Sequence, residues 1–265
     1  MRSVPPRDAR VRCRPGTVVG LVKAEDAPVA VHAGARTHIS LLGGFGLSDG
    51  RSDLIVAEGS QRLLAFLALR RRPVKRLLVA GTLWPLSSEA HAYSSLRSAL
   101  ARLDGARSSV VVTGSALRVA EGVTVDLWDS EALAHRLLVP GAAASANGGL
   151  TGDLAALSAD LLPDWYEDWA IVESEGWRQL RLHALEALAG ILTVEGSYGG
   201  AALAALSAIR VDPLRESPHA ALIRVHLAEG NRSEAARELS RYRDLLAEEL
   251  HIEPTERLRN LVEAR

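Results

Sequence analysis

The chain has 265 residues, of which 48% are apolar and 24% are charged, a composition that is normal for a soluble globular protein of two domains. One cysteine, Cys13, excludes an internal disulfide framework and suits a reducing compartment, so we expect the protein to be cytoplasmic. No run approaches the roughly 18 consecutive apolar residues of a membrane-spanning helix, and no apolar segment follows the arginine-bearing start of the chain. We therefore expect no membrane partner and no secretion.

The net charge of −1 conceals an uneven distribution along the chain. Residues 1 to 120 contain 18 Lys and Arg against 8 Asp and Glu, whereas residues 121 to 265 contain 13 against 24. A basic half joined to an acidic half is expected if only the first half binds a polyanion. The distribution therefore predicts two tasks on two domains, with double-stranded DNA as the partner of the first.

The beginning of the chain divides into a tail and a set of short strands. Residues 1 to 35 contain prolines, glycines and arginines without a sustained period, so we expect a mostly disordered basic tail. From His38 on, the segments HISLLGGFGLSDG and DLIVA are short apolar pieces separated by Gly and Asp. This pattern predicts small antiparallel strands.

Two helices are predicted next. SQRLLAFLALRRR fits a first helix with Ser60 as its N-cap, and its closing arginines favourably meet the helix dipole. Its inward face is predicted to carry Leu63, Leu64, Leu67 and Ala68. VKRLLVAGTLWP fits a second helix that turns Leu77, Leu78 and Leu83 inward.

The stretch from Ser87 to Leu103 predicts a third helix with two unlike faces, capped by Ser87 or Ser88 and ended by Asp104-Gly105. The apolar face carries Tyr93, Leu96, Leu100 and Leu103. The opposite face carries His91, Ser94, Ser95, Ser98 and Arg102, with Arg97 on its flank. Small side chains permit close approach to DNA and longer ones reach base edges or phosphates, so this face suits the major groove. An ordinary amphipathic surface helix would show the same pattern.

The end of the basic half predicts a hairpin and an exit into the second half. SSVVVTGSALRVAEG contains two β-rich runs around Gly114-Ser115, a pair suited to a tight hairpin turn. VTVDLWDSEALAHRLL predicts a strand and a helix that begins near Asp126, and GAAASANGGLTGD predicts a loop. Strands, three helices and a hairpin follow the order of a winged helix-turn-helix with an extra N-terminal sheet.

Several of these pieces resemble a known family. LLGGFGL, QRLLAFLALRRRPV, LWP, AYSSLRSALARLDG and TGSALRVAEGVTVDLWDSEAL are similar to the DNA-binding domain of actinobacterial antibiotic regulatory activators, the SARP-type branch of OmpR-like winged helices. The resemblance implies that the third helix enters the major groove and the hairpin touches the neighbouring backbone. The predicted DNA-binding residues lie on that helix and around the hairpin: His91, Ser94, Ser95, Arg97, Ser98, Arg102, Thr113, Ser115, Arg118 and Lys75.

The acidic half is predicted to be helical. LLPDWYEDWAIVESEGWRQLRLHALEALAGIL fits one long helix or two stacked ones, and Glu195-Gly196 recurs as Glu229-Gly230 at the tetratricopeptide period of 34 residues. The segments LLPDWYEDW and SEAARELSRYRDLLAEELHIEPTERLRNLVEAR resemble the start and the end of the bacterial transcriptional activator domain. We therefore expect an α+β winged helix over residues 36 to 122 and an all-α, tetratricopeptide-like domain over residues 123 to 265.

An enzyme would need a convergent set of catalytic groups. The sequence contains no P-loop, no His-Glu-x2-His motif, no clustered Cys and His ligands and no Gly-x-Ser-x-Gly elbow, so we expect no enzymatic activity, no cofactor and no bound metal. Trp165, Trp169 and Trp177 suit core packing better than base stacking, because acidic surroundings repel nucleic acid. The scattered histidines are expected at surface or partly buried helix positions.

Two functions remain compatible with the sequence. The first is a sequence-specific transcriptional activator; the family resemblance implies that it binds promoter direct repeats, recruits RNA polymerase and acts beside a second copy or another regulator. The second is a helical-repeat interaction scaffold or co-regulator whose winged helix no longer binds DNA. The charge asymmetry and the carboxylate-free polar face favour the first.

Overall fold

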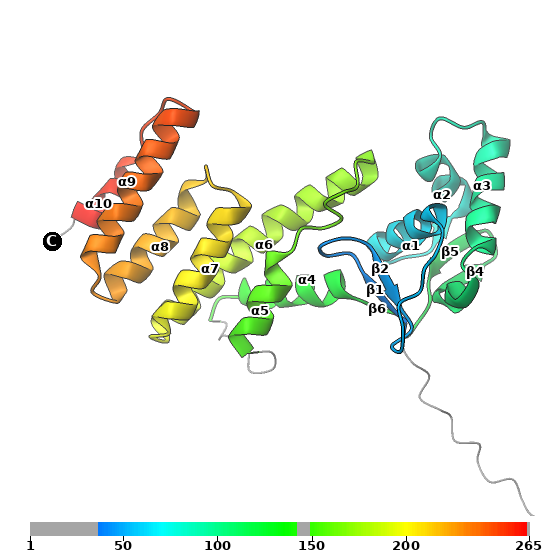
Figure 1. Cartoon of the computed structure of the whole chain (residues 1–265), viewed down its shortest axis with the longest axis horizontal. Coiled ribbons are helices and arrows are strands. Elements are labelled where there is room, and N and C mark those ends of the chain that lie inside the picture. The colour runs from blue at the N-terminus through cyan, green and yellow to red at the C-terminus, as the bar shows by residue number, and fades with distance from the viewer. Residues whose placement is uncertain (1–36, 142–148, 264–265) are drawn as a thin grey trace, which may run out of the picture. The chain divides into compact units, whose positions relative to one another are not determined.

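The computed structural model describes residues 37 to 141 and 149 to 263, so the predicted tail over residues 1 to 35 lies outside the described residues. The first part of the described chain contains both helices and strands (Figure 1). Its elements are β1 (His38–Ser40), β2 (Gly46–Ser48), α1 (Glu58–Arg70), β3 (Val74–Lys75), α2 (Arg76–Leu83), α3 (Glu89–Ala101), the 3-10 helix η1 (Asp104–Ser109), β4 (Val110–Thr113), β5 (Ala116–Val119) and β6 (Thr124–Val125).

The regular elements of the second part are all helices within its described residues. Its elements are α4 (Asp126–Leu137), α5 (Gly149–Ser158), α6 (Asp168–Val194), α7 (Tyr198–Val211), α8 (Glu216–Ala228), α9 (Arg232–Glu249) and α10 (Glu256–Glu263). Figure 1 shows α6 to α9 packed successively side by side, and each contacts the next. None of the described helices is both long and apolar enough to span a bilayer.

Two small sheets frame the first three helices. One has the order β2-β1-β6, with β1 antiparallel to β2 and parallel to β6; the other has the order β3-β5-β4 and is antiparallel. The strand predicted for DLIVA is wrong, because Asp53 makes only an isolated bridge to Ser48. The chain leaves β2 there so that Val56, 6% exposed, can enter the core beside α1.

The starts of the first two helices differ from the prediction. Ser60 is not an N-cap: α1 begins at Glu58 after Ala57, and the buried Ser60 hydroxyl donates to the Ala99 carbonyl, 2.7 Å away, which ties α1 to α3. The predicted inward orientation of two leucines of α2 is also wrong.

Leu77 and Leu78 are 56% and 50% exposed, and the buried residues of α2 are Val79, Ala80 and Leu83. Val74 pairs with Leu117 in the sheet and the helix starts only at Arg76, and the core packs against the side of α2 that carries its buried residues.

The basic half and the acidic half share one continuous core. The Phe66 ring of α1 meets the Trp169 ring of α6 edge-on at 5.4 Å, and the Trp128 indole of α4 donates to the Ala68 carbonyl at 2.9 Å. β6, which leads into α4, completes the first sheet by pairing with β1. The division into domains at residues 122 and 123 therefore stays a prediction.

Ion pairs between the halves use the arginines of α1. Arg62 pairs with Glu167 at 2.8 Å and Arg70 pairs with Glu173 at 3.0 Å. Arg71, the C-cap of α1, pairs with Glu131 of α4. Of these three arginines, Arg70 and Arg71 are predicted from the sequence only to meet the helix dipole, yet all three form ion pairs between the halves.

The predicted 34-residue repeat is confirmed at the level of single hydrogen bonds. Gly196 follows α6 with φ +75° and Gly230 follows α8 with φ +85°, a conformation that glycine adopts without strain. The next amides donate back to equivalent carbonyls, Ser197 to Leu192 at 2.8 Å and Asn231 to His226 at 2.7 Å. The repeat therefore comprises two helical hairpins, α6 with α7 and α8 with α9.

The structure describes the predicted long helix and only part of the loop predicted before it. The prediction of one long helix or two stacked ones resolves into a single helix, α6, of 27 residues. The loop predicted over GAAASANGGLTGD is wrong at its end, because α5 begins at Gly149. Contacts of α5 with α4, α6 and α7 stabilise a helix that small residues alone would not. The start of the loop, residues 142 to 148, lies outside the described residues.

The aromatic and histidine predictions are largely confirmed. Trp169 and Trp177 are buried, and the half-buried Trp165 stacks on Phe45 with 6.1 Å between ring centroids. His219 departs from the predicted surface or partly buried position: it is 4% exposed and its Nδ1 lies 2.7 Å from a carboxylate oxygen of Glu238. The pair joins α8 to α9, which is why both polar groups are accommodated inside.

Candidate nucleic-acid interface

Helix α3 is defined by polar caps at both ends. Ser88 is the N-cap: its hydroxyl accepts from the His91 amide at 3.5 Å and lies 2.8 Å from His91 Nδ1. At the other end the Arg107 guanidinium donates to the Leu100 carbonyl at 2.7 Å, and Asp104 turns the chain with φ +41°. The predicted N-cap and end of this helix are confirmed.

The two faces predicted for α3 are confirmed. Its buried residues are all apolar: Ala92, Leu96, Ala99 and Leu100. Leu103, just beyond the helix, is completely buried, and Tyr93 is half-buried. The exposed residues include His91, Ser94, Arg97, Ser98 and Arg102. Ser95 is half-buried at the margin, so the side chains predicted to meet DNA lie away from the core.

The polar face borders a shallow groove of about 360 Å³. Five of the predicted residues line it together: His91, Ser94, Ser95, Ser98 and Arg102. Trp84, the N-cap Ala57 and, from the first turn of α1, Gly59 and Ser60 also line it. The sequence did not indicate that Trp84 would lie here, since the position of an indole at a helix end depends on packing. Arg97 does not line the groove and points from the flank of the helix, as predicted.

The hairpin places the remaining predicted residues on one sheet. Lys75 and Thr113 both pair in register with Ala116, from its two sides, so all three side chains share a face. Arg118 follows Ala116 by two residues in β5, so its side chain shares that face. Leu117, between them, is buried on the other face of the sheet. Figure 1 shows α3 and the β4-β5 hairpin at the same end of the molecule, and η1 contacts both α3 and β4.

The turn of this hairpin has the predicted form. Gly114 has φ +58°, which suits the first central residue of a tight hairpin turn. The Ser115 carbonyl accepts from the Arg76 amide at 2.8 Å, which links the turn to the start of α2. The exposed Thr113 and Ser115 therefore stand at a rigid tip.

The cations of this surface differ in whether a carboxylate neutralises them. Arg118 pairs with Glu121 at 2.9 Å, and the Glu121 side chain is 89% exposed. Within the described residues Arg97, Arg102 and Lys75 have no side-chain hydrogen bond or ion pair. Arg72, which sequence reasoning had assigned only to the end of α1, is likewise exposed and without a carboxylate partner there. Unpaired cations next to hydroxyls form a surface suited to a polyanion.

Comparison with known proteins identifies the helical half. The family model of the bacterial transcriptional activator domain matches residues 125 to 264, more than half of the chain. The chain belongs to this family. The activator domain as matched begins in β6, two residues from the boundary predicted at residue 123, and the match confirms the resemblance to SARP-type activators.

A solved structure extends the likeness to the winged helix. EmbR of Mycobacterium tuberculosis, determined in complex with a low-affinity phosphopeptide, is similar with a TM-score of 0.60 and 22% sequence identity. The alignment covers 86% of this chain and 64% of the EmbR chain, so the chain spans less than two thirds of its relative's length. The likeness supports the predicted fold of a winged helix followed by a tetratricopeptide-like activator domain. No match was found among curated proteins.

Within residues 37 to 141 and 149 to 263 no set of three or more His, Cys, Asp and Glu side chains is arranged to hold a metal ion.

Proposed function

We propose that the protein is a sequence-specific DNA-binding transcriptional activator, in which α3 enters the major groove and the β4-β5 hairpin contacts the adjacent backbone. The observation that carries the proposal is the exposed polar face of α3, where Arg97 and Arg102 have no carboxylate partner among the described residues. A major groove admits an α-helix, and cations left free by the fold are available for phosphates and base edges.

Individual residues receive different roles in this proposal. Arg102 reads a base edge, because it lines the groove beside the short serines of α3. His91 uses one ring nitrogen on Ser88 and keeps the other for DNA. Arg97, on the flank of α3, and Lys75 and Arg118, on the hairpin sheet, bind phosphates and set the register of the protein on the duplex.

Recruitment of RNA polymerase is the second part of the proposal. Leu77 and Leu78 of α2 are about half exposed, and Leu86 in the turn between α2 and α3 is fully exposed. Apolar side chains exposed together favour a protein partner. We propose that polymerase contacts this leucine surface while α3 is held on DNA, and that two copies of the protein bind adjacent direct repeats.

Combined alanine substitution of His91, Ser94, Ser98 and Arg102 in the full chain tests the DNA-binding proposal. These residues are exposed, so melting should stay nearly unchanged while promoter DNA binding is lost in a gel-shift assay. Arg243→Ala is the control, since Arg243 is an exposed arginine paired with Asp244 on α9. Unchanged DNA affinity in the folded fourfold variant would favour the interaction scaffold instead.

A further inference from the structure

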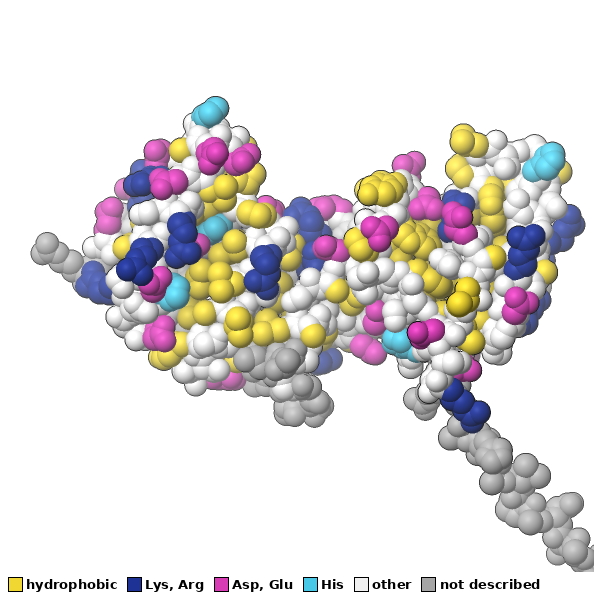
Figure 2. Space-filling view, in the orientation of Figure 1, with side chains coloured by type: hydrophobic (Ala, Val, Ile, Leu, Met, Phe, Trp, Pro, Cys, Tyr) yellow, Lys and Arg dark blue, Asp and Glu magenta, His cyan; other side chains and the backbone are white. Residues whose placement is uncertain are grey.

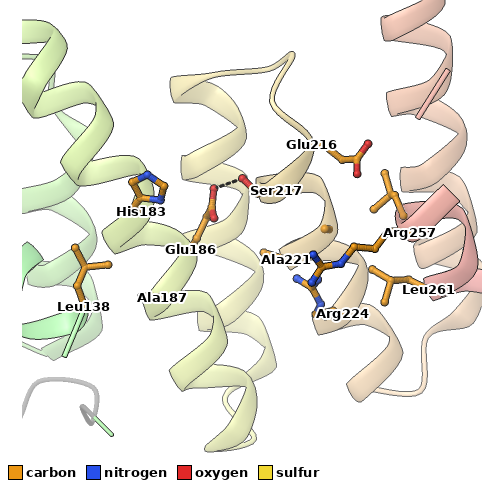
Figure 3. Close-up of a pocket in the computed structure, with 12 residues that line it drawn as sticks. Leu138, His183, Glu186, Ala187, Glu216, Ser217, Ala221, Arg224, Arg257 and Leu261 are labelled. Carbon is orange, nitrogen blue, oxygen red and sulfur yellow. Dashed lines mark hydrogen bonds between the residues drawn. The ribbon is translucent and has the colours of Figure 1, made fainter. Parts of the chain in front are cut away.

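A second groove, of about 570 Å³, crosses the activator domain. Figure 3 shows that it runs over α6 and α8, with Leu138 at one end and α10 at the other. Its volume lies within the range of about 300–1,000 Å³ that small-molecule sites occupy. The DNA-binding proposal makes no use of this groove.

The walls of the groove are mainly apolar. Short side chains from α6 and α8 form its floor, and leucines form its margins: Ala187, Ala220, Ala221, Leu138, Leu258 and Leu261. Leu138 is 41% exposed, although it follows a helix whose other leucines are buried. The groove therefore offers an apolar surface to a ligand.

The carboxylates in the lining are already engaged. Glu186 accepts from the Ser217 hydroxyl at 2.7 Å, the contact drawn in Figure 3. Glu216 accepts from the amide of Thr255 at 2.9 Å and from the hydroxyl of the same residue, which fastens the start of α10 to α8. Neither carboxylate pairs with an arginine of the groove, and both serve the packing of the helices.

The two arginines of the groove are not engaged. Arg224 comes from α8 and Arg257 from α10, and in Figure 3 both side chains extend into the groove. Neither has a hydrogen bond or an ion pair with any described residue. Two like charges directed into one space repel each other, and an anion between them removes that repulsion. A guanidinium also matches carboxylate and phosphate oxygens through paired hydrogen bonds.

We infer that this groove binds a small organic anion, with its carboxylate or phosphate held between Arg224 and Arg257 and its apolar body lying on the alanine floor. The volume of the groove, about 570 Å³, lies in the range of small-molecule sites, so the proposed ligand is a small molecule and a peptide is an outcome of the test. The inference does not depend on DNA binding by α3.

Fluorescence titration of the full chain with anilinonaphthalene sulfonate tests the inference, because this probe joins an anionic group to an apolar ring system. We expect one bound probe per chain, and much weaker binding of phenylnaphthylamine, which has the same rings without the charge. Arg224→Gln with Arg257→Gln should weaken the sulfonate probe about tenfold or more, as expected for lost charged hydrogen bonds. Ala187→Phe, which fills the floor without changing charge, should weaken both probes.

Arg259→Gln is the matched control, since Arg259 is an exposed arginine of α10 outside the groove. It should leave probe affinity unchanged within about twofold, and all these variants should keep wild-type promoter affinity. Equal probe affinity in the folded double variant, or equal affinity for charged and neutral probes, would overturn the inference. Displacement of the probe by a short glutamate- and leucine-rich peptide, but not by decanoate, would overturn it in favour of a protein partner.

Discussion

Helices α3 and α9 are both amphipathic and both carry arginines on their exposed sides, yet the surroundings of those arginines differ. On α9, Arg237 pairs with Glu234 and Arg243 pairs with Asp244, and only Arg232 at the start of the helix lacks a carboxylate partner among the described residues. On α3 and its C-cap, Arg97 and Arg102 have no such partner among the described residues. Figure 2 shows blue and magenta side chains intermixed over the α9 and α10 end. The difference teaches that free cations, and not the number of arginines, mark a surface for a polyanion.

The buried faces of the two helices differ as well. The core side of α3 is wholly apolar, whereas α9 buries Glu238 at 4% exposure against His219 of α8. The apolar core side of α3 therefore contains no buried charge that needs a partner. The polar pair on α9 instead fixes which helix of the repeat packs beside α8. Five predictions sharpen or break this comparison.

Removal of the buried carboxylate of α9 should have the largest effect. Glu238→Ala leaves His219 without its partner inside the core and should lower the free energy of unfolding of the full chain by about 3–5 kcal/mol. Urea denaturation measures this change. A loss below about 1 kcal/mol would show that water replaces the carboxylate and that α9 does not depend on the pair.

The same pair predicts a pH dependence. Burial acts to raise the pKa of Glu238, but the hydrogen bond and the charge of His219, together with Arg241, lower it below its ordinary value of 4.5. Since the folded state has the lower pKa, the carboxylate stabilises the fold above about pH 4.5 and loses this effect as the pH falls through its folded pKa. The stability difference between wild type and Glu238→Gln should therefore shrink on acidification.

Truncation of a leucine on the apolar face of either helix should lower the free energy of unfolding slightly less than loss of the Glu238 carboxylate. Leu100 on α3 and Leu246 on α9 are 5% and 2% exposed, so Leu100→Ala and Leu246→Ala should each lower the free energy of unfolding by about 2–5 kcal/mol. Equal costs would confirm that the two helices differ only in their polar residues. A much smaller cost at Leu100 would mean that α3 is loosely packed and poorly suited to hold side chains for base recognition.

Loss of a free arginine should weaken DNA binding without affecting the fold. Arg102→Ala should cost about 1–3 kcal/mol of binding free energy and relax the preference at one operator position, with an unchanged melting temperature. Fluorescence anisotropy with a set of operator variants measures both effects. Arg243→Ala on α9, whose charge is already paired, should change neither; a uniform loss over all sequences in Arg102→Ala would assign that residue to phosphate.

The smallest effect is expected at the one paired cation of the hairpin. Glu121→Gln frees Arg118 from its ion pair and should tighten DNA binding by less than about fivefold, because both side chains are at least partly exposed. Arg118→Ala should reduce the slope of log affinity against log salt by about 1. An unchanged slope in both variants would remove the hairpin from the DNA interface.

The sequence by itself determined the order of the first three helices and the hairpin, the two faces of α3 and the repeat of the acidic half. These features depend on local rules: Ser88 caps the His91 amide, the four-residue spacing of Leu96 and Leu100 directs both to one side of the helix, and Gly196 and Gly230 follow helices at equal positions of the repeat. The resemblance to SARP-type activators rested on the same local segments, and the activator-domain match agrees with it.

Only the tertiary structure decided which charges are free and which are used internally. Arg62 and Arg70 contributed to the basic charge of the first half, but they pair with Glu167 and Glu173 about a hundred residues away. In the same way the core packs against the side of α2 that leaves Leu77 exposed, and α10 brings Arg257 to the groove of α8. The local spacing of residues determines which face of a helix a side chain lies on. The segment that packs against that face comes from a distant part of the chain, and no local pattern identifies it.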